Sequence, residues 1–243
     1  MGSEYRHCLL EFEALSSRLT EPGFIEYLSS FSICCLVETF TSENFDFSIY
    51  FAEYLVFHSS AIKLSSHGRR SGGAVILIKK SYSLKVTSIP CRQDNMVAVK
   101  ISSPDGHDIV ITCVYIPPTD SPYYRDKLIK CNLELLEELL LDVRRLNPDA
   151  SLVLCGDFNA RIGKWNLHSD LSEDDQDEVG YICLCPDYTA GRESEDVHVN
   201  HFGEILMDLC RVHHMFVTNG CNKGDEHGKF TYVSQHGESV VDY

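Results

Sequence analysis

The chain has 243 residues, which suits one large domain or two small ones. Its hydrophobic fraction of 44% is ordinary for a globular protein, so a sizeable core can form. Acidic residues outnumber basic ones by 36 to 21, and the net charge of −15 argues against broad electrostatic binding to nucleic acid. A nucleic-acid substrate would need a local basic strip, for which Arg69-Arg70 and Lys79-Lys80 are candidates.

The cysteines and the lengths of the apolar segments indicate whether the protein is intracellular, secreted or membrane-spanning. The 11 cysteines are an odd number and lie mostly in apolar stretches, which favours buried free thiols in an intracellular protein. Cys183-Leu184-Cys185 has no second half at zinc-ligand spacing, so we expect no zinc there. No charged leader precedes an apolar segment, and no apolar run approaches roughly 18 residues, so neither secretion nor membrane spanning is expected.

The N-terminal half predicts one helix followed by several strands. Thr20, with Pro22 close behind it, marks a helix start, and apolar residues then recur at helical spacing. Gly72-Gly73 and Pro117-Pro118 are the clearest breaks between the strands. Short apolar runs predict strands at 33–37, 49–57, 74–78, 84–89, 96–101 and 108–116.

The C-terminal half contains the longest predicted helix, from about residue 124 to 146. Its expected apolar stripe consists of Leu128, Leu135, Leu139 and Val143. A strand at 152–155, a helix from about Phe202, a strand at 215–217 and a hairpin of 230–233 with 239–241 follow. The acidic run 170–178 is expected to be a solvated insertion, because its glycine spacing does not fit an EF-hand.

The order of these elements predicts the architecture. Many short strands with few helices are typical of a sheet-rich α/β sandwich. The sequence has no internal repeat and no Pro/Gly-rich linker, so we expect a single domain over residues 1–243.

The most informative segment is a short apolar run that ends in an acid and an amide. Residues 151–155 predict a buried strand, and Gly156, Asp157, Phe158 and Asn159 follow it directly. In an extended segment, residues i and i+2 point the same way, so Asp157 and Asn159 can face one site while Phe158 faces the core. A carboxylate and an amide so placed suit a hard cation or a phosphate.

Two further predicted strands end in a polar side chain, Glu38 and Tyr115. Taken alone, Glu38 is more typical of a solvated strand end and Tyr115 of an interfacial aromatic. Asn219-Gly220 alone would be a turn. Sites in α/β proteins usually lie at the carboxyl ends of strands, so it is their joint occurrence in this order that indicates a site.

The ordered motifs resemble the endonuclease/exonuclease/phosphatase superfamily, and within it the endonuclease domain of non-LTR (LINE-type) retrotransposon polyproteins. The resemblance covers the chain from about Leu15 to Tyr243. The motifs are CLVETF at 35–40, SGGAV at 71–75, VYIPP at 114–118, GDFNARIG at 156–163, NG at 219–220, GKFT at 228–231 and SVVDY at 239–243. GDFN alone is moderately specific, whereas several motifs in order are a strong signal.

The resemblance implies a DNase I-like fold, a four-layer α/β sandwich of two packed mixed sheets flanked by helices. It implies Mg²⁺-dependent hydrolysis of DNA phosphodiester bonds, with Mn²⁺ as a substitute. It also implies a monomeric, nuclear protein that binds DNA and no membrane, with a reverse transcriptase domain in the parent polyprotein.

The resemblance also implies roles for single residues. Glu38 would hold the divalent cation, and Asp157 would orient or deprotonate the attacking water. Asn159 and Tyr115 would donate hydrogen bonds to phosphate oxygens. Asp242 would orient a histidine through its ring N–H.

Three weaker assignments complete the expected site. Thr231 and Asn219 would contact the substrate phosphate. Glu11 stands where the family has the Asn of an Asn-x-x-Gly-Leu motif, so it would be a second metal ligand. Its extra negative charge near Glu38 would tighten the cation but repel an anionic substrate.

A second departure from the family concerns the end of the domain. The family closes with a Ser-Asp-His strand after the Asp-Tyr pair, whereas this sequence ends at Tyr243. We therefore expect a C-terminally truncated domain that lacks its last strand and its histidine, with a rate lowered by about 10²–10⁴-fold. Two alternatives stay open: a catalytically inactive remnant, or another phosphodiesterase or phosphatase acting on abasic DNA, RNA or an inositol phosphate.

Overall fold

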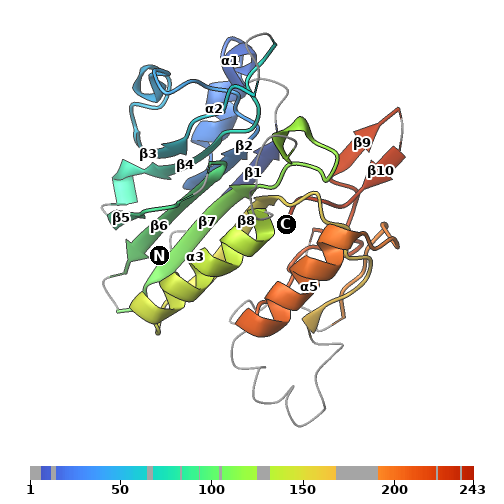
Figure 1. The fold of residues 1–243 in the computed structure, drawn as a ribbon. Helices are drawn as coiled ribbons and strands as arrows, with labels where there is room; N and C mark the ends of the chain where they lie inside the picture. Colours follow the sequence, from blue (N-terminus) through green and yellow to red (C-terminus); the bar gives the residue numbers. More distant parts are fainter. Residues whose placement is uncertain are drawn as a thin grey trace. The chain divides into compact units, whose positions relative to one another are not determined.

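A computed structural model describes residues 7–11, 15–64, 68–82, 84–92, 94–103, 106–124, 132–167, 191–222, 224–235 and 237–243. The chain divides into two compact units, one ending at Asp157 and the other running from Phe158 to Tyr243, and each is described by itself (Figure 1). The expectation of a single domain stays a prediction. The acidic run 170–178 and the Cys183/Cys185 pair lie outside the described residues.

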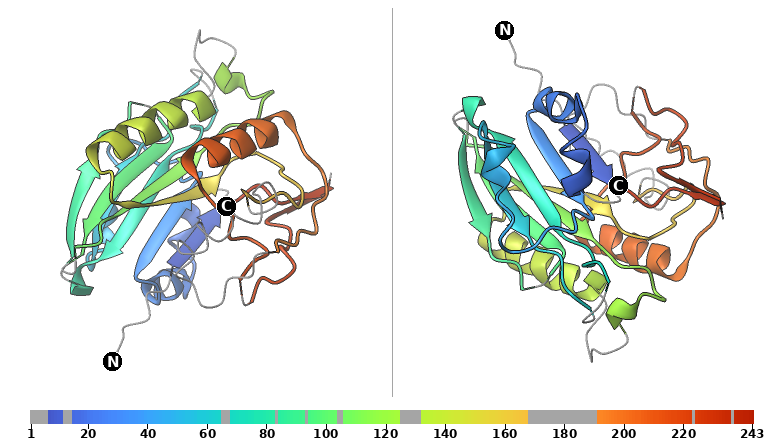
Figure 2. Two further views of the ribbon diagram at one scale, coloured as in Figure 1. Left: turned by 90° about the horizontal axis from the view of Figure 1, so that it is seen from below. Right: turned by 90° about the horizontal axis from the view of Figure 1, so that it is seen from above.

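The first unit is built on two four-stranded mixed sheets, which form separate layers in the views of Figure 2. The first sheet has the order β1-β2-β4-β3, with β1 and β2 parallel and β4 antiparallel to both its neighbours. The second has the order β5-β6-β7-β8, with only β7 and β8 parallel. The strands are β1 (His7–Glu11), β2 (Ile33–Val37), β3 (Tyr54–Ser59), β4 (Ala74–Lys79), β5 (Lys85–Ile89), β6 (Met96–Ser102), β7 (Ile109–Tyr115) and β8 (Ser151–Asp157).

Strand β2 shows why the two sheets pack together. All five of its residues are buried, as expected for a continuous apolar run that is covered on both faces. Cys35 and Val37 belong to the core between the sheets, where they join Cys113 and Tyr115 of β7. The alternate residues Cys34 and Leu36 belong to a second core on the outer face of the first sheet.

Helices cover the two outer faces of the first unit. Leu15 of α1 (Leu15–Arg18) and Leu28 of α2 (Phe24–Ser29) are completely buried against the first sheet. On the second sheet, Val143 of α3 (Asn132–Leu146) packs with Val110 of β7 (Figure 1). The unit is therefore a four-layer α/β sandwich of two packed mixed sheets flanked by helices, which confirms the predicted fold class.

The predicted apolar stripe of α3 is displaced. The described helix begins at Asn132, and Leu128 lies outside the described residues. Leu135 and Leu139 are only half-buried, whereas the fully buried face consists of Leu133, Leu136, Leu140 and Val143. This leucine-rich helix carries apolar side chains on adjacent positions, so tertiary packing, and not the pattern, determines which of them faces the sheet.

The other strand predictions hold with four corrections, one of which is the hairpin, predicted at 230–233 and 239–241 but formed by residues 232–234 and 237–239. Strand β3 begins at Tyr54 because residues 47–49 form the 3-10 helix η1 (Phe47–Ile49), which is capped by the side chain of Asp46. Strand β8 continues beyond the predicted end, through Asp157. Residues 215–217, predicted as a strand, have no regular structure. Two further 3-10 turns are η2 (Lys80–Tyr82) and η3 (Pro122–Tyr124).

The second unit contains helix α5 (His201–His213) and an antiparallel hairpin of β9 (Tyr232–Ser234) and β10 (Gly237–Ser239). Asn200 caps α5 by accepting a hydrogen bond from the Gly203 N–H at 2.7 Å. Most of its other described residues lie in loops, which are joined by backbone and side-chain hydrogen bonds. Across the described part of both units, no helix combines the length and apolarity needed to cross a membrane.

Candidate active site

In the first unit, three cysteines, one each on β2, β7 and β8, lie side by side, and we call them the cysteine rung. The Sγ atoms of Cys35, Cys113 and Cys155 all lie within 4.8 Å of one another. Tyr115 and Asp157 stand two residues beyond this rung, about 7 Å at the usual rise of a strand. They are direct partners in the parallel β7–β8 ladder. Thr39, the residue after Glu38, donates to the Gly73 carbonyl oxygen at 3.3 Å, and Gly73 and Tyr115 are both hydrogen-bonded to Asn95. The three expected site residues of this unit therefore reach one edge.

Glu38 begins a strained turn at that edge. Strand β2 ends at Val37, and Glu38 adopts the left-handed region at φ 52°, which non-glycine residues seldom do. Phe40 repeats this conformation, and its N–H donates to the Gly72 carbonyl oxygen at 2.9 Å. The half-buried Glu38 is thus turned out of the strand by a backbone conformation that costs about 1–3 kcal/mol and is common at functional sites.

Asp157 and Tyr115 are held almost out of solvent. Their exposed fractions are 3% and 7%. The Asp157 carbonyl oxygen accepts a hydrogen bond from the Ile116 N–H at 2.8 Å, which extends the ladder past the strand end. Gly156 makes this close approach possible, because a Cβ there would collide with the Val114 carbonyl group. In the motif, Gly156 is therefore required by the backbone, and the candidate acid Asp157 follows it.

Asn95 is the residue of this edge that sequence reasoning missed. It is fully buried in the left-handed region at φ 66°. Its N–H donates to the Ser59 hydroxyl at 3.1 Å, its Oδ1 accepts from the Gly73 N–H at 2.9 Å, and its carbonyl oxygen accepts from the Tyr115 N–H at 2.9 Å. Asn95 thereby joins the ends of β3, β4 and β7. Only the tolerance of Asn for positive φ hinted at this role.

Glu11 is placed through its backbone alone. It is the last residue of β1 and pairs with Val37, so the end of β1 lies beside the residue that precedes Glu38. The expectation that Glu11 is a second metal ligand stays a prediction.

In the second unit, Asn159 leaves the extended conformation. Its φ is 47°, so the prediction that Asn159 continues the strand with an i, i+2 relation to Asp157 is wrong, although Phe158 is buried as expected. The Asn159 carbonyl oxygen accepts from Nδ2 of Asn200 at 3.0 Å. The Oδ1 of Asn200 accepts from the Arg161 N–H at 2.9 Å. Asn200 therefore fixes the turn of the motif as well as capping α5.

Side chains also hold the segment around Asp242, a residue that is 8% exposed. The Thr231 hydroxyl oxygen accepts from the N–H groups of Val241 and Asp242 at 3.1 and 3.2 Å. The Nδ2 of Asn219 donates to the Asp242 carbonyl oxygen at 2.9 Å. The structure thus brings Thr231, Asn219 and Asp242 together within the second unit, where the first two brace the third. Their predicted phosphate contacts stay predictions.

A buried ion pair completes this bracing. Arg161 donates twice to Asp196, with both distances 2.7 Å, and the Asp196 side chain is 1% exposed. The same carboxylate accepts from the N–H groups of Val240 and His198 at 3.0 Å each. Burial alone would raise the pKa of Asp196, but the bonds from Arg161 and the backbone outweigh it and hold the pKa below its ordinary value.

The predicted basic strip is divided. Arg69 and Arg70 precede β4 at the edge that carries Glu38, and the Arg69 guanidinium lies 4.6 Å from the centroid of the Phe40 ring. Lys79 lies at the opposite end of β4, about 17 Å away for a strand of this length. Lys79-Lys80 therefore cannot belong to one strip with the arginines, because a six-residue strand separates them.

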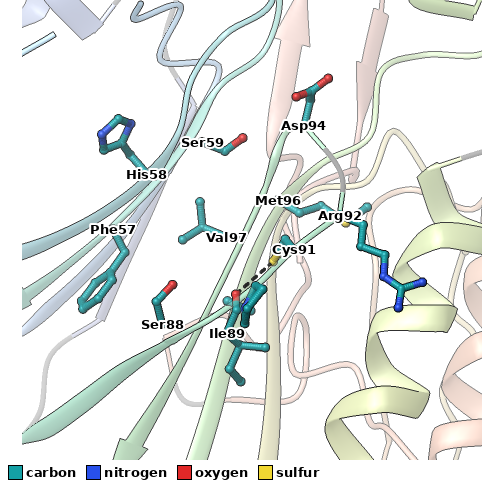
Figure 3. A pocket seen from close by; sticks show the side chains of 12 residues that line it. Phe57, His58, Ser59, Ser88, Ile89, Cys91, Arg92, Asp94, Met96 and Val97 are labelled. Atoms are coloured by element: carbon teal, nitrogen blue, oxygen red, sulfur yellow. Dashed lines mark hydrogen bonds between the residues drawn. The ribbon is translucent and has the colours of Figure 1, made fainter. Parts of the chain in front are cut away.

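A hollow of about 440 Å³ opens between β3 and the β5–β6 connection of the first unit (Figure 3). His58 and Ser59 line it from β3, and Arg92 and Asp94 from the connection. Burial lowers the pKa of His58, which favours a neutral imidazole. Since Ser59 and Asp94 lie beside Asn95 at the site edge, the hollow is a place where the first unit could receive part of a substrate next to its acids.

The donor set of the first unit suits Mg²⁺, the cation that the resemblance implies. Glu38 offers a carboxylate from a left-handed backbone conformation, and Asp157 offers a second acid at the same edge. Hard cations of this kind prefer carboxylate and water oxygens. The Nδ2 of Asn95, buried and without a hydrogen-bond partner among the described residues, is a further polar atom that an ordered ligand or water would satisfy.

The comparisons with known proteins agree with this geometry. The model of the Endonuclease/Exonuclease/phosphatase family matches residues 14–227. Among solved structures, the endonuclease domain of TRAS1, a telomere-specific non-LTR retrotransposon, is 19% identical with a TM-score of 0.53, over 98% of this chain and 82% of that one. No curated protein sequence matches the chain.

Two further structures share the fold. An AP endonuclease from Archaeoglobus fulgidus is 18% identical with a TM-score of 0.50, over 86% of this chain and 71% of that one. The 3′ phosphatase NExo from Neisseria, bound to a product DNA hairpin, is 15% identical with a TM-score of 0.51, over 98% and 85%. These identities support the fold, and the family match supports phosphoester-cleaving chemistry. The chain belongs to the endonuclease/exonuclease/phosphatase family.

Proposed function

We propose that the protein is a Mg²⁺-dependent endonuclease domain that nicks duplex DNA, derived from a non-LTR retrotransposon. The observation that carries the proposal is the convergence of Glu38, Tyr115 and Asp157 at one edge of the first unit. The likeness of the fold to the TRAS1 endonuclease domain supports the retrotransposon origin. A DNA partner, a reverse transcriptase domain in the parent polyprotein, a monomeric state and a nuclear location belong to the same proposal.

The residues at this edge have different proposed roles: binding the cation, activating water and binding the phosphate. Glu38, with Glu11 as a weaker second ligand, would hold Mg²⁺, and Mn²⁺ would substitute for it. When bound, the cation neutralises the charge that develops on the phosphate oxygens. Asp157 is nearly buried and accepts or orients the proton of the attacking water. The Tyr115 hydroxyl donates to a phosphate oxygen, and the Asn95 carbonyl fixes the Tyr115 backbone.

In the second unit, Asn159 is the proposed amide donor, and Thr231 the proposed hydroxyl donor to a phosphate. The Thr231 oxygen accepts two backbone N–H groups, and its own proton can still be donated. Asp242 would orient a histidine. The arginines before β4 supply positive charge beside Glu38, which offsets the acidity of the chain for an anionic substrate.

The nicking of supercoiled plasmid tests the proposal. We expect conversion to the open circle with Mg²⁺, none with a chelator in excess, and a loss of about 10²–10⁴-fold for Asp157→Asn. Asp149→Asn is the matched control, because Asp149 is an exposed acid just before the other end of β8 and should leave the rate unchanged. Circular dichroism checks that both variants fold.

The outcomes separate the alternatives. If Asp157→Asn nicks as fast as the parent protein, or nicking needs no divalent cation, the proposed site is wrong. If the folded parent protein binds Mg²⁺ but cleaves neither plain, abasic nor RNA duplexes, the inactive remnant is the correct reading. Faster cleavage of abasic DNA or RNA than of plain duplex would instead assign another substrate to the same edge.

A further inference from the structure

The cysteine rung beneath the candidate active site has a chemistry that hydrolysis of a phosphodiester does not need. Cys35 comes from one sheet, and Cys113 and Cys155 come from the other, so three thiols of different strands meet in the core between the sheets. None of them is in a disulfide. Their Sγ atoms lie within 4.8 Å of one another, close enough for all three to reach a single ion.

The separation of the sulfur atoms fits a soft cation. Zinc–sulfur bonds are about 2.3 Å long, so three sulfur ligands on one such ion stand about 4 Å apart. Sulfur atoms that already lie within 4.8 Å need to close by less than about 1 Å. Strands joined by ladder hydrogen bonds can absorb such a shift through side-chain rotation. Soft thiolate ligands select ions such as Zn²⁺ and Cu⁺ over the hard Mg²⁺.

We propose that Cys35, Cys113 and Cys155 form a binding site for one thiophilic cation of the Zn²⁺, Cd²⁺ and Cu⁺ class. The ion lies between the two sheets and ties β2 to β7 and β8, one level below Glu38, Tyr115 and Asp157. It is distinct from the proposed catalytic cation in ligands and in hardness. The inference does not depend on the nuclease proposal, because the cysteines contribute nothing to that chemistry.

The protonation of the thiols sets the conditions for binding. Hydrogen bonds from Cys113 and Cys155, together with burial, raise the pKa of Cys35, and the pKa of Cys113 is raised mainly by its bond with Cys155. The free cluster is therefore neutral, and each thiolate that binds the ion releases one proton to solvent. Two thiolates and one thiol balance a divalent ion, which avoids a net charge in the core. Affinity then rises roughly a hundredfold per pH unit when two protons are released.

An ion can reach this core from one side. Cys35 and Cys113 are buried, whereas Cys155 is half-buried on β8, the last strand of its sheet. Two residues earlier on the same strand, Val153 is 43% exposed. Cys155 is thus the entry ligand, and its removal should affect ion binding more than it affects the packed core.

Cadmium titration under reducing, oxygen-free conditions tests the site. The background protein carries Cys183→Ser and Cys185→Ser, which removes the other closely spaced thiol pair of the sequence. We expect an ultraviolet sulfur-to-metal charge-transfer band that saturates at one Cd²⁺ per chain and is displaced by Cu⁺. Cys155→Ala should abolish this band. Cys34→Ala should retain it, because Cys34 is the neighbour of Cys35 on β2 but faces the outer core and donates to the Leu28 carbonyl oxygen.

A second measurement protects the test against a variant that fails to fold. The cadmium-113 chemical shift of the background protein counts sulfur ligands without any change in the rung, and three are expected. Glu38→Gln should leave the Cd²⁺ stoichiometry unchanged. Fewer than three sulfur ligands, a band that survives in folded Cys155→Ala, or a band lost in folded Cys34→Ala would overturn the proposal.

Discussion

The two units hold their candidate site residues by different kinds of hydrogen bond. In the first unit, Tyr115 and Asp157 end a parallel ladder of backbone bonds, which many sequences could form. In the second, the chain around Asp242 has the backbone bond from the Phe158 N–H to the Val241 carbonyl oxygen, but otherwise relies on side chains, above all Thr231 and the Arg161–Asp196 pair. A backbone ladder survives most side-chain changes, whereas a side-chain brace fails when its one residue is replaced. Stability changes should therefore differ between the units.

The largest effect is expected at Arg161, the partner of a buried charge. Arg161→Ala leaves the Asp196 carboxylate buried without its cation and should lower the free energy of unfolding by about 3 kcal/mol. Urea denaturation measures the loss. Amide exchange should accelerate at Val240, whose N–H donates to Asp196. Lys164→Ala is the control, because it breaks the exposed Lys164–Glu193 pair of the same unit, worth less than about 1 kcal/mol.

The same pair gives a pH dependence of known sign. Because the folded pKa of Asp196 is depressed, its contribution to stability is full above the unfolded value of about 3.9 and is lost as pH falls through the folded pKa. Acid titration of the parent protein should show this loss, and Arg161→Ala should reduce it. Equal acid sensitivity in the two proteins would mean that Arg161 does not hold the carboxylate ionised.

In the first unit, a substitution that disturbs the backbone is expected to lower stability most. Gly156→Ala places a Cβ against the Val114 carbonyl at φ 141°, so it should cost about 2–3 kcal/mol and open the β7–β8 ladder at its active-site end. Gly106→Ala is the matched control, with positive φ but no atom within 4 Å, and should cost about 1 kcal/mol. Equal losses for both would show that the close approach to Val114 is unimportant.

The smallest effect is expected at Thr231, whose environment is exposed. Thr231→Val removes the acceptor of two N–H groups and should cost about 1 kcal/mol, since water can replace part of it. Thr231→Ser keeps the oxygen and should restore stability. Faster exchange at the amides of Val241 and Asp242, with β7 unaffected, would localise the effect. A spread of faster exchange into β7 would contradict the contrast between the two units.

What the sequence could predict follows the same division. The bounds of β2 were predictable because five apolar residues in a row are buried on both faces, and the same held for most of β4, β6 and β7. The acids at their ends followed from the strand bounds. The rung of cysteines that aligns those strands did not, because it requires knowing how two sheets face each other.

The rest depends on contacts that no local pattern encodes. Asp196 lies 35 residues from Arg161, and Asn95 touches three strands without belonging to any. The prediction that Asn159 continues the extended strand failed because its left-handed turn is held by Asn200, far along the chain. The prediction of which face of α3 is buried failed for a different reason, because adjacent leucines allow more than one buried face.

The place of Asn95 limits how this fold can diversify. Its three hydrogen bonds close the β5–β6 connection onto the ends of β3, β4 and β7, so a single inserted residue there would displace Tyr115 along with the connection. Loops elsewhere can lengthen at little cost. New target preferences, in nature or in the laboratory, would therefore have to be grafted onto other loops while this short span keeps its length.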